Sequence, residues 1–366
     1  MRVIVTGGGT GGHIYPALAI ADKFKEMDPE TEILYVGNEE GIEKDVVPKT
    51  GYPMELVDAR WLDKSSPWQL IKTGARVAKG VLEANRVMRK FKPDVVIGTG
   101  GYVCFPVIIA GKRFGAKTFL HEQNAFPGLA NRTLEKYVNK VFLGFSDAAK
   151  YFKDPSKMVE AGNPVRKSFF SLNKTEARKK LGFPQDDFIV FSFGGSLGAE
   201  KINEVAFELM QVVNGHEKMR MVFGTGKWYY DSIIKKAEER GIVLKDNILI
   251  KDYIDDMENY LAASDLIISR AGALSVAETT VCGRASILIP SPNVTGNHQY
   301  YNAKAVADRG GAILIEEKDL TSEGLIKEVM HLKNNPEIAE KMGRAARACA
   351  PMKALDIIYD EIQAAL

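Results

Sequence analysis

A histidine ends a glycine-rich loop near the start of the chain. Residues 7–13 read GGGTGGH and lie between an apolar run, Val3–Val5, and a helical pattern from about Tyr15 to Met27. Free backbone N–H groups at such a helix start can bind anionic oxygen, and glycine lets a ligand approach closely. An imidazole suits proton abstraction from a hydroxyl near neutral pH, so His13 is a candidate general base. The alternative is a structural turn with a histidine that caps the helix.

Two common nucleotide motifs do not fit this loop. The second apolar run ends Val36-Gly37-Asn38, without the ribose-binding carboxylate of a dinucleotide GxGxxG site. His13 also stands where a Walker loop needs its lysine and hydroxyl. The loop therefore predicts an anion site of another kind.

A second glycine loop opens the second half of the chain. Residues 193–199 read FGGSLGA after an apolar run and before a helix that begins near Glu200. Flexible backbone, the hydroxyl of Ser196 and a helix start are what is needed to hold a diphosphate without a metal. Arg166 could add a fixed charge there, although a surface ion pair is the alternative for it.

Residues 269–278, SRAGALSVAE, again join a strand to a helix, with Glu278 about one turn into the helix. A carboxylate there can accept two hydroxyl groups of a ribose, or it can simply stabilise the helix dipole. The turn-rich segment from Pro290 to Gln299 could present amides to the hydroxyls of a sugar. An ordinary surface loop explains its composition equally well.

Four polar residues, His121 to Asn124, follow another apolar run and precede Pro127-Gly128. They predict a recognition loop or a structural hydrogen-bonding cluster. No HxxxH pair or nearby cysteine completes a metal site, and no Asp-x-Asp occurs in the chain. We therefore predict no metal and no cofactor, and we expect helix starts to hold any phosphate.

Short apolar runs alternate with helical stretches, as a parallel sheet requires. The runs form a first set and a second set: Val3–Val5, Ile33–Val36, Met54–Val57, Val95–Ile97, Thr118–Leu120 and Val141–Leu143; then Phe188–Phe193, Met221–Phe223, Ile248–Ile250, Leu266–Ile268, Ile287–Ile289 and Ile313–Ile315. This predicts an α/β protein with two Rossmann-like lobes facing a cleft that holds the substrates.

The turn Ala161-Gly162-Asn163-Pro164 marks a hinge between the two sets. We therefore predict domains at residues 1–163 and 164–366. Two further helical stretches, 336–350 and 352–366, have no following strand, and the last helix could pack back on the first domain.

Composition limits the class of protein. The 366 residues are 45% hydrophobic and 26% charged, and the formal charge of +2 gives no indication of nucleic acid. Cys104, Cys282 and Cys349 form no CxxC pair and suit a reducing compartment. We expect no export signal, because the N-terminal MRVIVTGGGTGGH has no apolar h-region, and no spanning helix, because no apolar stretch reaches about 18 residues.

One stretch of the first half is strongly basic. Residues 67–92 hold seven basic residues against one acidic residue, Glu83. Lys72, Arg76 and Lys79 share a helix face by spacing. With apolar residues nearby they could dock on an anionic membrane surface: Trp61, Leu62, Trp68 and Phe105. A solvated helix face with core aromatics is the alternative.

Seven motifs, in this order along the chain, resemble one family. They are GGGTGGH (7–13), IGTGGYV (97–103), HEQNAFPGLANR (121–132), AGNPVR (161–166), FGGSLGA (193–199), SRAGALSVAE (269–278) and NHQYYNA (297–303). The set spans Arg2 to about Ala312 and is far more specific than any single motif. It is similar to the MurG family of peptidoglycan N-acetylglucosaminyltransferases.

The resemblance implies an inverting, metal-independent hexosyltransferase of the glycosyltransferase B architecture. Its donor would be UDP-N-acetylglucosamine (UDP-GlcNAc) and its acceptor lipid I, undecaprenyl-pyrophosphoryl-MurNAc-pentapeptide, giving lipid II for peptidoglycan. Such an enzyme would be peripheral on the cytoplasmic face of the cell membrane. Cell-wall and division proteins are candidates for further partners, and nucleic acid is not.

The family pattern also implies roles for residues. The donor's diphosphate, uracil and ribose would be held by Arg166 and Ser196, the backbone of Ile254, and Glu278, respectively. Its phosphates and sugar would be surrounded by Ala273, Leu274, Gln299 and Asn124. The reacting end would be closed by Thr10, Gly11 and Gly12. His13 would lie nearest the attacking MurNAc 4-hydroxyl as base or as an orienting group, and Tyr102 would line the acceptor side.

Three places depart from the family pattern and bear on the acceptor mouth and the phosphate loop. They are Phe105, where glycine is usual, Leu197, where glutamine is usual, and the atypical 59–66 loop. Other functions remain as alternatives: a glycolipid synthase that uses diacylglycerol, a UDP-sugar epimerase, and a nucleotide-sugar sensor without turnover.

Overall fold

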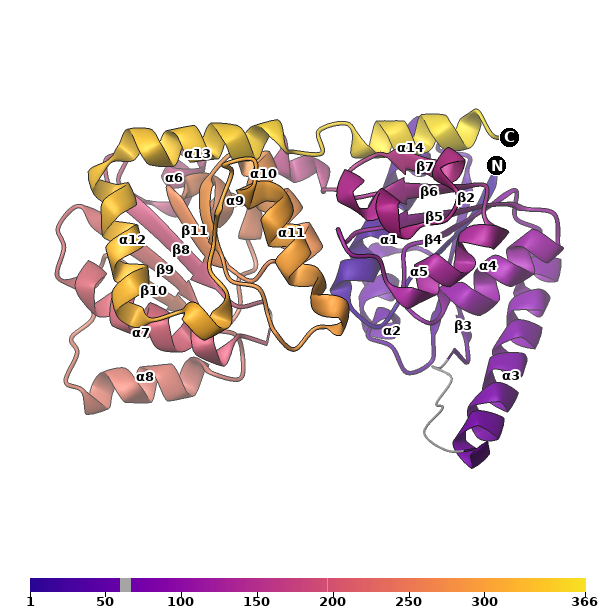
Figure 1. Cartoon of the computed structure of the whole chain (residues 1–366), viewed down its shortest axis with the longest axis horizontal. Helices are drawn as coiled ribbons and strands as arrows, with labels where there is room; N and C mark the ends of the chain where they lie inside the picture. The colour runs from indigo at the N-terminus through magenta and orange to yellow at the C-terminus, as the bar shows by residue number, and fades with distance from the viewer. Residues whose placement is uncertain (60–66, 196) are drawn as a thin grey trace. The chain divides into compact units, whose positions relative to one another are not determined.

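The computed structural model describes residues 1–59, 67–195 and 197–366, with the side chains of residues 67–75 left undescribed. The predictions for Ser196, for Trp61 and Leu62 in the 59–66 loop, and for the side chains of Trp68 and Lys72 lie outside the described residues. The chain divides into two compact units, Met1–Val165 with Lys353–Leu366, and Arg166–Met352 (Figure 1). The last 14 residues thus belong to the first unit rather than to the second range.

The first unit is built on one parallel sheet. Its seven strands lie in the order β3-β2-β1-β4-β5-β6-β7, with all pairs parallel. Their bounds are β1 Arg2–Thr6, β2 Glu32–Asn38, β3 Met54–Val57, β4 Val95–Gly98, β5 Lys117–Glu122, β6 Lys140–Leu143 and β7 Met158–Glu160. Side chains alternate across the sheet, so Ile4 enters one core while Val3 and Val5 enter the other.

Helices cover both faces of this sheet. They are α1 Gly11–Met27, α2 Glu43–Val46, α3 Pro67–Phe91, α4 Cys104–Arg113, α5 Leu129–Leu134 and α14 Ala354–Gln363, with 3-10 turns η1 Val47–Thr50, η2 Glu135–Tyr137, η3 Ser146–Tyr151 and η4 Pro155–Lys157. One core lies between the sheet and the helices that include α3 and α4, and the other includes α1 and α14.

The second unit repeats the plan with six parallel strands in the order β10-β9-β8-β11-β12-β13. The strands are β8 Phe188–Phe193, β9 Met219–Gly224, β10 Ile248–Lys251, β11 Leu266–Ser269, β12 Ala285–Leu288 and β13 Ile313–Leu314. Numbered within the unit, this is the order 3-2-1-4-5-6 of a doubly wound nucleotide-binding fold. The first six strands of unit one follow the same order.

The helices of the second unit also lie on both sides of the sheet. Their bounds are α6 Lys174–Leu181, α7 Glu200–Asn214, α8 Tyr230–Glu239, α9 Met257–Ala263, α10 Ala273–Cys282, α11 His298–Ala307, α12 Ser322–Asn334 and α13 Pro336–Ala348, with η5 Lys167–Phe169, η6 Thr295–Asn297 and η7 Glu317–Asp319. The predicted α/β class with two Rossmann-like domains is confirmed. One short strand, β7, was not predicted, because its three residues carry little apolar pattern.

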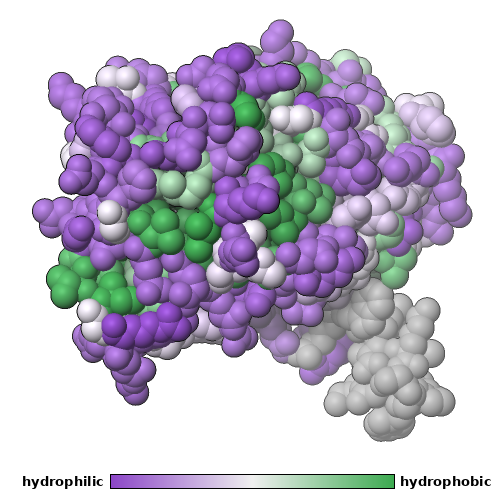
Figure 2. All heavy atoms as spheres, turned by 60° about the vertical axis from the view of Figure 1, so that its left-hand side comes forward, coloured by the Kyte–Doolittle hydropathy of each residue, from purple (hydrophilic) through white to green (hydrophobic). Residues whose placement is uncertain are grey.

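The surface has the distribution expected of a folded globular protein. On the face drawn in Figure 2, hydrophilic residues predominate and hydrophobic residues gather in smaller areas between them. Trp228 and Val243 are the most exposed of the large apolar side chains in the described part. In the described part of the chain, none of the helices combines the length and the apolar character needed to cross a membrane.

The last helix, α14, is part of the core of the first unit. Ile358 and Ile362 are fully buried, and Tyr359 packs edge-to-face on Phe24 of α1 with ring centroids 5.1 Å apart. Lys23 of α1 also pairs with Asp356 at 2.6 Å. Helix α14, although it follows the whole second unit in the sequence, thus covers part of one face of the first sheet.

Shortening Ile362 to valine is expected to lower the free energy of unfolding of the first unit by about 1 kcal/mol, since a buried methyl group is lost. Urea unfolding of the full chain measures it. The exposed Leu366→Val is the control, with a change within about 0.5 kcal/mol. Equal stability of Ile362→Val and the wild-type chain would mean that α14 does not stay packed on α1 in solution.

Candidate active site

The two glycine loops follow β1 and β8, at the positions where the strand order of each sheet reverses. In the first unit this is the point between β1 and β4, and in the second the point between β8 and β11. Ligands of open α/β sheets bind at such points, since neighbouring loops separate there.

The start of the loop after β1 is held in place by neighbouring residues. Tyr35 donates its hydroxyl proton to the carbonyl of Gly7 at 2.6 Å, and Gly8 N–H donates to Gly100 O at 3.2 Å. A Cβ on Gly7 would lie 2.1 Å from Oγ1 of Thr99, so only glycine fits. Burial, and next the charge of Glu43, raise the pKa of Tyr35 far above its usual range, which keeps this phenol a donor.

The ring of His13 is oriented by the loop that precedes it. Its Nδ1 lies 2.9 Å from the carbonyl oxygen of Gly8 and 3.5 Å from Oγ1 of Thr10. A carbonyl oxygen only accepts hydrogen bonds, so Nδ1 carries the proton in the neutral ring. Nε2 then presents its lone pair, which is the state that a general base needs.

Gly100, in the loop after β4, packs against the other edge of this ring. Its φ is +118°, and a Cβ there would lie 2.6 Å from Cδ2 and 2.8 Å from Nε2 of His13. Thr99 from the same loop donates to the backbone oxygen of His13 at 2.7 Å. The conformation and the close approach therefore both require glycine.

Gly100→Ala is expected to lower kcat about 10–100-fold, because it displaces the imidazole from its place. Steady-state kinetics measures the change. Gly115→Ala is the matched control: it also sits at positive φ, +86°, in the first unit, but its Cβ meets nothing within 4 Å. If both variants lose the same activity, backbone strain rather than contact with His13 is the cause.

Glu43 is a residue at this site that sequence reasoning missed. It begins α2, and its carboxylate is fully buried. Oε2 accepts the N–H of Gly9 at 3.0 Å, and Oε1 accepts the N–H of Asn38 at 2.9 Å. In the sequence Glu43 is one of several charged residues around a short helix, and nothing distinguishes it from the others. Its burial becomes evident only from the glycines that surround it in the structure.

The polar cluster after β5 is largely structural. His121 is fully buried, and its Nε2 donates to the carbonyl of Gly162 at 3.0 Å while Nδ1 accepts from Gln123 at 3.0 Å. Burial lowers the pKa of His121 to about 4, so the ring stays neutral. Hydrogen bonding, the alternative left open for this segment, therefore explains His121 and Gln123.

Glu122 is the centre of the same cluster. It accepts the backbone N–H groups of Asn124 and Gly128, both at 3.0 Å, and Nδ2 of Asn131 at 2.9 Å. Nδ2 of Asn124 also donates to it at 3.2 Å. Asn124 is thus half-buried and held by a carboxylate at the edge of the sheet. Tyr102 is half-exposed in the turn that leads into α4.

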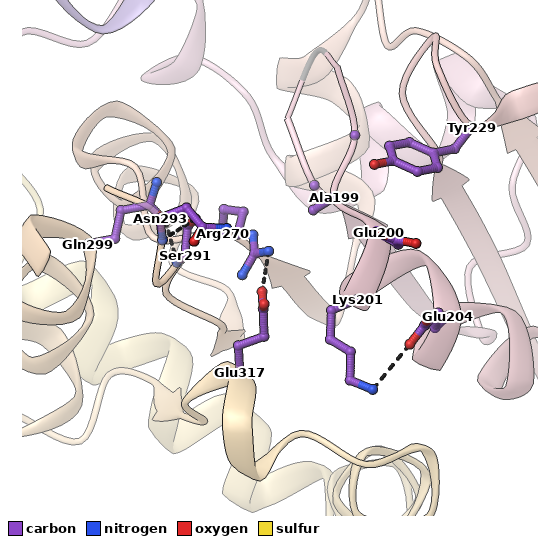
Figure 3. Close-up of a pocket in the computed structure, with 12 residues that line it drawn as sticks. Ala199, Glu200, Lys201, Glu204, Tyr229, Arg270, Ser291, Asn293, Gln299 and Glu317 are labelled. Atoms are coloured by element: carbon purple, nitrogen blue, oxygen red, sulfur yellow. Dashed lines mark hydrogen bonds and ion pairs between the residues drawn. The ribbon is translucent and has the colours of Figure 1, made fainter. Parts of the chain in front are cut away.

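The second unit contains a polar cavity of about 530 Å³ at its switch point. It is lined by residues of the loops after β8, β9, β11 and β12 and by α7, α11 and η7: Gly194, Gly198, Ala199, Glu200, Lys201, Glu204, Tyr229, Arg270, Ser291, Asn293, Gln299 and Glu317. Figure 3 shows Tyr229 and α7 on one side of it and Arg270 with Ser291, Asn293 and Gln299 on the other. The predicted phosphate loop and Gln299 therefore meet here.

Arg270 is fixed in this cavity by three contacts. Its Nη1 donates to the carbonyls of Ile289 and Pro290 at 3.3 and 3.2 Å, and its Nη2 pairs with Glu317, as Figure 3 shows. Oε1 of Gln299 accepts the N–H of Ser291 at 2.9 Å. Arg270 and Glu317 were not among the predicted site residues, although Arg270 lies inside one of the motifs.

Glu278 lies on α10 with a carboxylate that accepts no hydrogen bond from any described residue. Burial raises its pKa to about 7, against a lowering effect of Arg166 and a further rise from Glu258. The Glu278 residue is half-buried, and a carboxylate whose pKa is raised in this way is a candidate to accept hydroxyl groups from a ligand.

The other predicted donor residues do not line the cavity. Arg166 is half-exposed, 3.5 Å from Glu258 and over the ring of Phe169 at 5.2 Å. Ile254 is half-buried against Gly224. Ala273 and Leu274 form the first turn of α10.

Comparison with known proteins assigns the chain. Residues 3–143 match the glycosyltransferase family 28 N-terminal domain, and residues 189–358 match its C-terminal domain. A UDP-N-acetylglucosamine--N-acetylmuramyl-(pentapeptide) pyrophosphoryl-undecaprenol N-acetylglucosamine transferase of Alkaliphilus oremlandii is 42% identical over 100% of this chain and 99% of its own. A protein of the same name from Acetivibrio thermocellus is 42% identical over 99% of this chain and 98% of its own. The chain belongs to the MurG family.

The solved structures agree with this membership. Acinetobacter baumannii MurG superposes with a TM-score of 0.78 at 25% identity over 99% of both chains. A putative UDP-N-acetylglucosamine 2-epimerase from Listeria monocytogenes has a TM-score of 0.73 at 20% identity, covering 100% of this chain and 96% of its own, which shows a shared fold alone. As a MurG-family protein with both family 28 domains, the chain is a glycosyltransferase and not a binding protein without turnover.

Proposed function

We propose that the chain transfers N-acetylglucosamine from UDP-GlcNAc to the 4-hydroxyl of MurNAc in lipid I, forming lipid II for peptidoglycan synthesis. The observation that carries this proposal is the full-length similarity to transferases whose names specify that donor and that acceptor. The orientation of His13 supports it, because an Nδ1–H imidazole at a sheet edge can receive a hydroxyl proton on Nε2.

The chemical step is a single displacement with inversion. The MurNAc 4-oxygen forms a bond to the anomeric carbon as the bond from that carbon to the UDP oxygen breaks. His13 takes the hydroxyl proton, and the electron pair of the broken bond leaves on UDP. Thr10, which precedes α1, and Gly11 and Gly12 in its first turn present backbone N–H groups to charge on the reacting end.

Donor binding is proposed for the second unit, and Asn124 is proposed to contact the donor's sugar. Glu278 accepts ribose hydroxyls, the backbone of Ile254 binds uracil, and Arg166, Ser196 and the helix starts of α7 and α10 hold the diphosphate. Gln299, Ala273 and Leu274 surround the phosphates and the sugar. The proposal includes no metal, because backbone N–H groups at the helix starts and the charge of Arg166 would hold the diphosphate.

A peripheral position on the cytoplasmic face of the membrane is proposed from charge. Exposed cations of α3 include Lys79 and Lys90, although Lys79 shares its charge with Asp58 and Glu83 at 3.4 Å and Lys90 pairs with Glu55 at 2.9 Å. An anionic leaflet would compete with these weak surface pairs. Binding at the membrane would bring the enzyme to its lipid acceptor. Its product, lipid II, would link the enzyme to cell-wall growth, cell shape and division.

The test is transfer of radiolabelled N-acetylglucosamine to a short-chain lipid I analogue, with a chelator present and diacylglycerol in a parallel reaction. Labelled lipid II is expected in the presence of chelator. Label in the glycolipid alone would mean that the acceptor is diacylglycerol and not lipid I. Release or isomerisation of the donor without an acceptor would favour an epimerase.

A further inference from the structure

The buried carboxylate of Glu43 has no part in the reaction described above, yet it contacts the loop that orients His13. It is fully buried and accepts two backbone N–H groups, those of Gly9 and Asn38. Burying a charge is costly unless it is hydrogen-bonded, and two backbone donors offset only part of that cost. A residue of this kind is therefore a candidate for a role beyond packing.

Glu43 and His13 bind opposite ends of one peptide group. The N–H of Gly9 donates to Glu43 Oε2 at 3.0 Å, and the C=O of Gly8 accepts from His13 Nδ1 at 2.9 Å. These two groups belong to the same Gly8–Gly9 peptide, which is trans, so they point in opposite directions. A negative charge at the N–H end polarises the amide and increases the negative charge on its oxygen.

We propose that Glu43 is a positioning residue that acts on His13 through the Gly8–Gly9 peptide. The carboxylate, the peptide and the imidazole form a relay that holds the Nδ1–H tautomer and stabilises the imidazolium formed when Nε2 takes the acceptor's proton. The inference rests on the proposed role of His13 as base. As in a Ser-His-Asp triad, the carboxylate of the proposed relay takes no proton from the substrate, and that proton stays on the imidazole.

The packing around Glu43 keeps the relay in place. A Cβ on Gly8 or Gly41 would lie 2.2 or 2.1 Å from its carboxylate oxygens, and one on Gly37 would lie 2.8 Å from its Cγ. One glycine from the loop after β1 and two from the end of β2 and the turn after it thus make room for one side chain. The carboxylate has little freedom to turn away from Gly9.

The neighbouring buried ionisable groups stay neutral. Burial raises the pKa of Tyr35 far above its usual range, and it raises the pKa of Cys104, on α4, to about 12. The remaining ionisable side chains on the segments that pack here are exposed: Tyr15, Tyr102, Glu39, Glu40, Lys44 and Asp45. Glu43 is therefore the buried acidic group that can act on His13 through the Gly8–Gly9 peptide.

Glu43→Gln is expected to lower kcat about tenfold or more, because glutamine cannot accept from both backbone N–H groups and carries no charge. The KM for donor should not change. The acid limb of the pH profile of kcat/KM should move to lower pH, since the imidazolium loses its support. A residue that merely holds the loop would lower activity without moving that limb.

Glu135→Gln is the matched control. Glu135 is also buried in the first unit, and its Oε1 accepts two backbone N–H groups, those of Lys153 and Asp154, both at 2.7 Å. Its loss should leave kcat and the pH profile as in the wild-type chain. If both substitutions change kcat and the pH profile equally, the effect of Glu43→Gln comes from the loss of a buried carboxylate in general and not from a relay to His13.

A double-mutant cycle separates the relay from the base itself. In a His13→Ala background, Glu43→Gln should no longer affect kcat, since its partner is gone. An undiminished effect there overturns the relay and leaves the base intact. If His13→Ala alone does not lower kcat, the base and the relay both fail, while the product assay still decides whether the chain transfers the sugar.

A final measurement needs no Glu43 variant. The full chain contains five histidines, and ¹⁵N spectra of histidine-labelled protein, assigned with His13→Ala, report the tautomer of each. We expect the neutral ring of His13 to carry its proton on Nδ1. An Nε2–H tautomer would overturn the proposal even if Glu43→Gln does not fold.

Discussion

Replacing His13 by alanine is expected to lower kcat about 10²–10⁴-fold, the range that a positioned general base contributes. The reason is geometric. Nδ1 is committed to the carbonyl of Gly8, so Nε2 is the ring atom that can take the hydroxyl proton. Initial rates with saturating UDP-GlcNAc and the lipid I analogue measure the loss.

Donor affinity decides what the loss means. The residues proposed for the donor's nucleotide lie in the second unit, so calorimetric titration with UDP-GlcNAc should give the same Kd for the His13→Ala and wild-type chains. His331→Ala is the control, because His331 is an exposed side chain of α12 that contacts Asn335. A weakened Kd, rather than a lowered kcat, would make His13 a binding residue and not the base.

The architecture could be read from the sequence because parallel strands buried on both faces leave uninterrupted apolar runs. Met54–Val57 and Phe188–Phe193 were predicted with the bounds that the structure gives. Helix α1 begins at Gly11, four residues before the apolar pattern at Tyr15, because its first turn consists of the glycines and histidine of the loop. Patterns of hydrophobicity cannot locate such a turn.

The site was predictable only in part. Glycine loops before helices are local features, and both lie at switch points of their sheets. The burial of Glu43 and of His121 depends on residues far away in the chain, Gly8 and Gly162 respectively, so no local pattern reveals it. Polar residues that look alike in the sequence can therefore be assigned to the site or to the structure around it only when their contacts are known.

The strongest expected effect in the second unit concerns Glu278, which we expect to weaken the unliganded fold. Its pKa is raised to about 7 from the ordinary 4.5 because it is buried. Between these values the folded chain keeps a proton that the unfolded chain has released. Stability therefore falls as pH rises from about 4.5 to 7, and above 7 the penalty is fully present.

Glu278→Gln is accordingly expected to stabilise the second unit at pH 8 by about 1–3 kcal/mol, with the gain disappearing toward pH 4.5. Urea unfolding at pH 5 and pH 8 measures it. Glu340→Gln, which removes an exposed partner of Arg344, is the control and should change stability by less than about 0.5 kcal/mol. A variant less stable than the wild-type chain at pH 8 would mean that the carboxylate supports the fold.

The same substitution is expected to weaken UDP-GlcNAc binding about 10–100-fold, because a charged acceptor for the ribose hydroxyls is lost. In the wild-type chain, donor binding should tighten as pH rises through 7, since hydroxyl donors favour the ionised carboxylate, and it should release protons near that pH. Calorimetry in buffers of different ionisation enthalpy measures this release. Ligand binding would explain why the chain has a glutamate at position 278 that destabilises the unliganded fold: the ribose hydroxyls would donate hydrogen bonds to its carboxylate. Unchanged affinity of Glu278→Gln for UDP-GlcNAc would contradict this explanation.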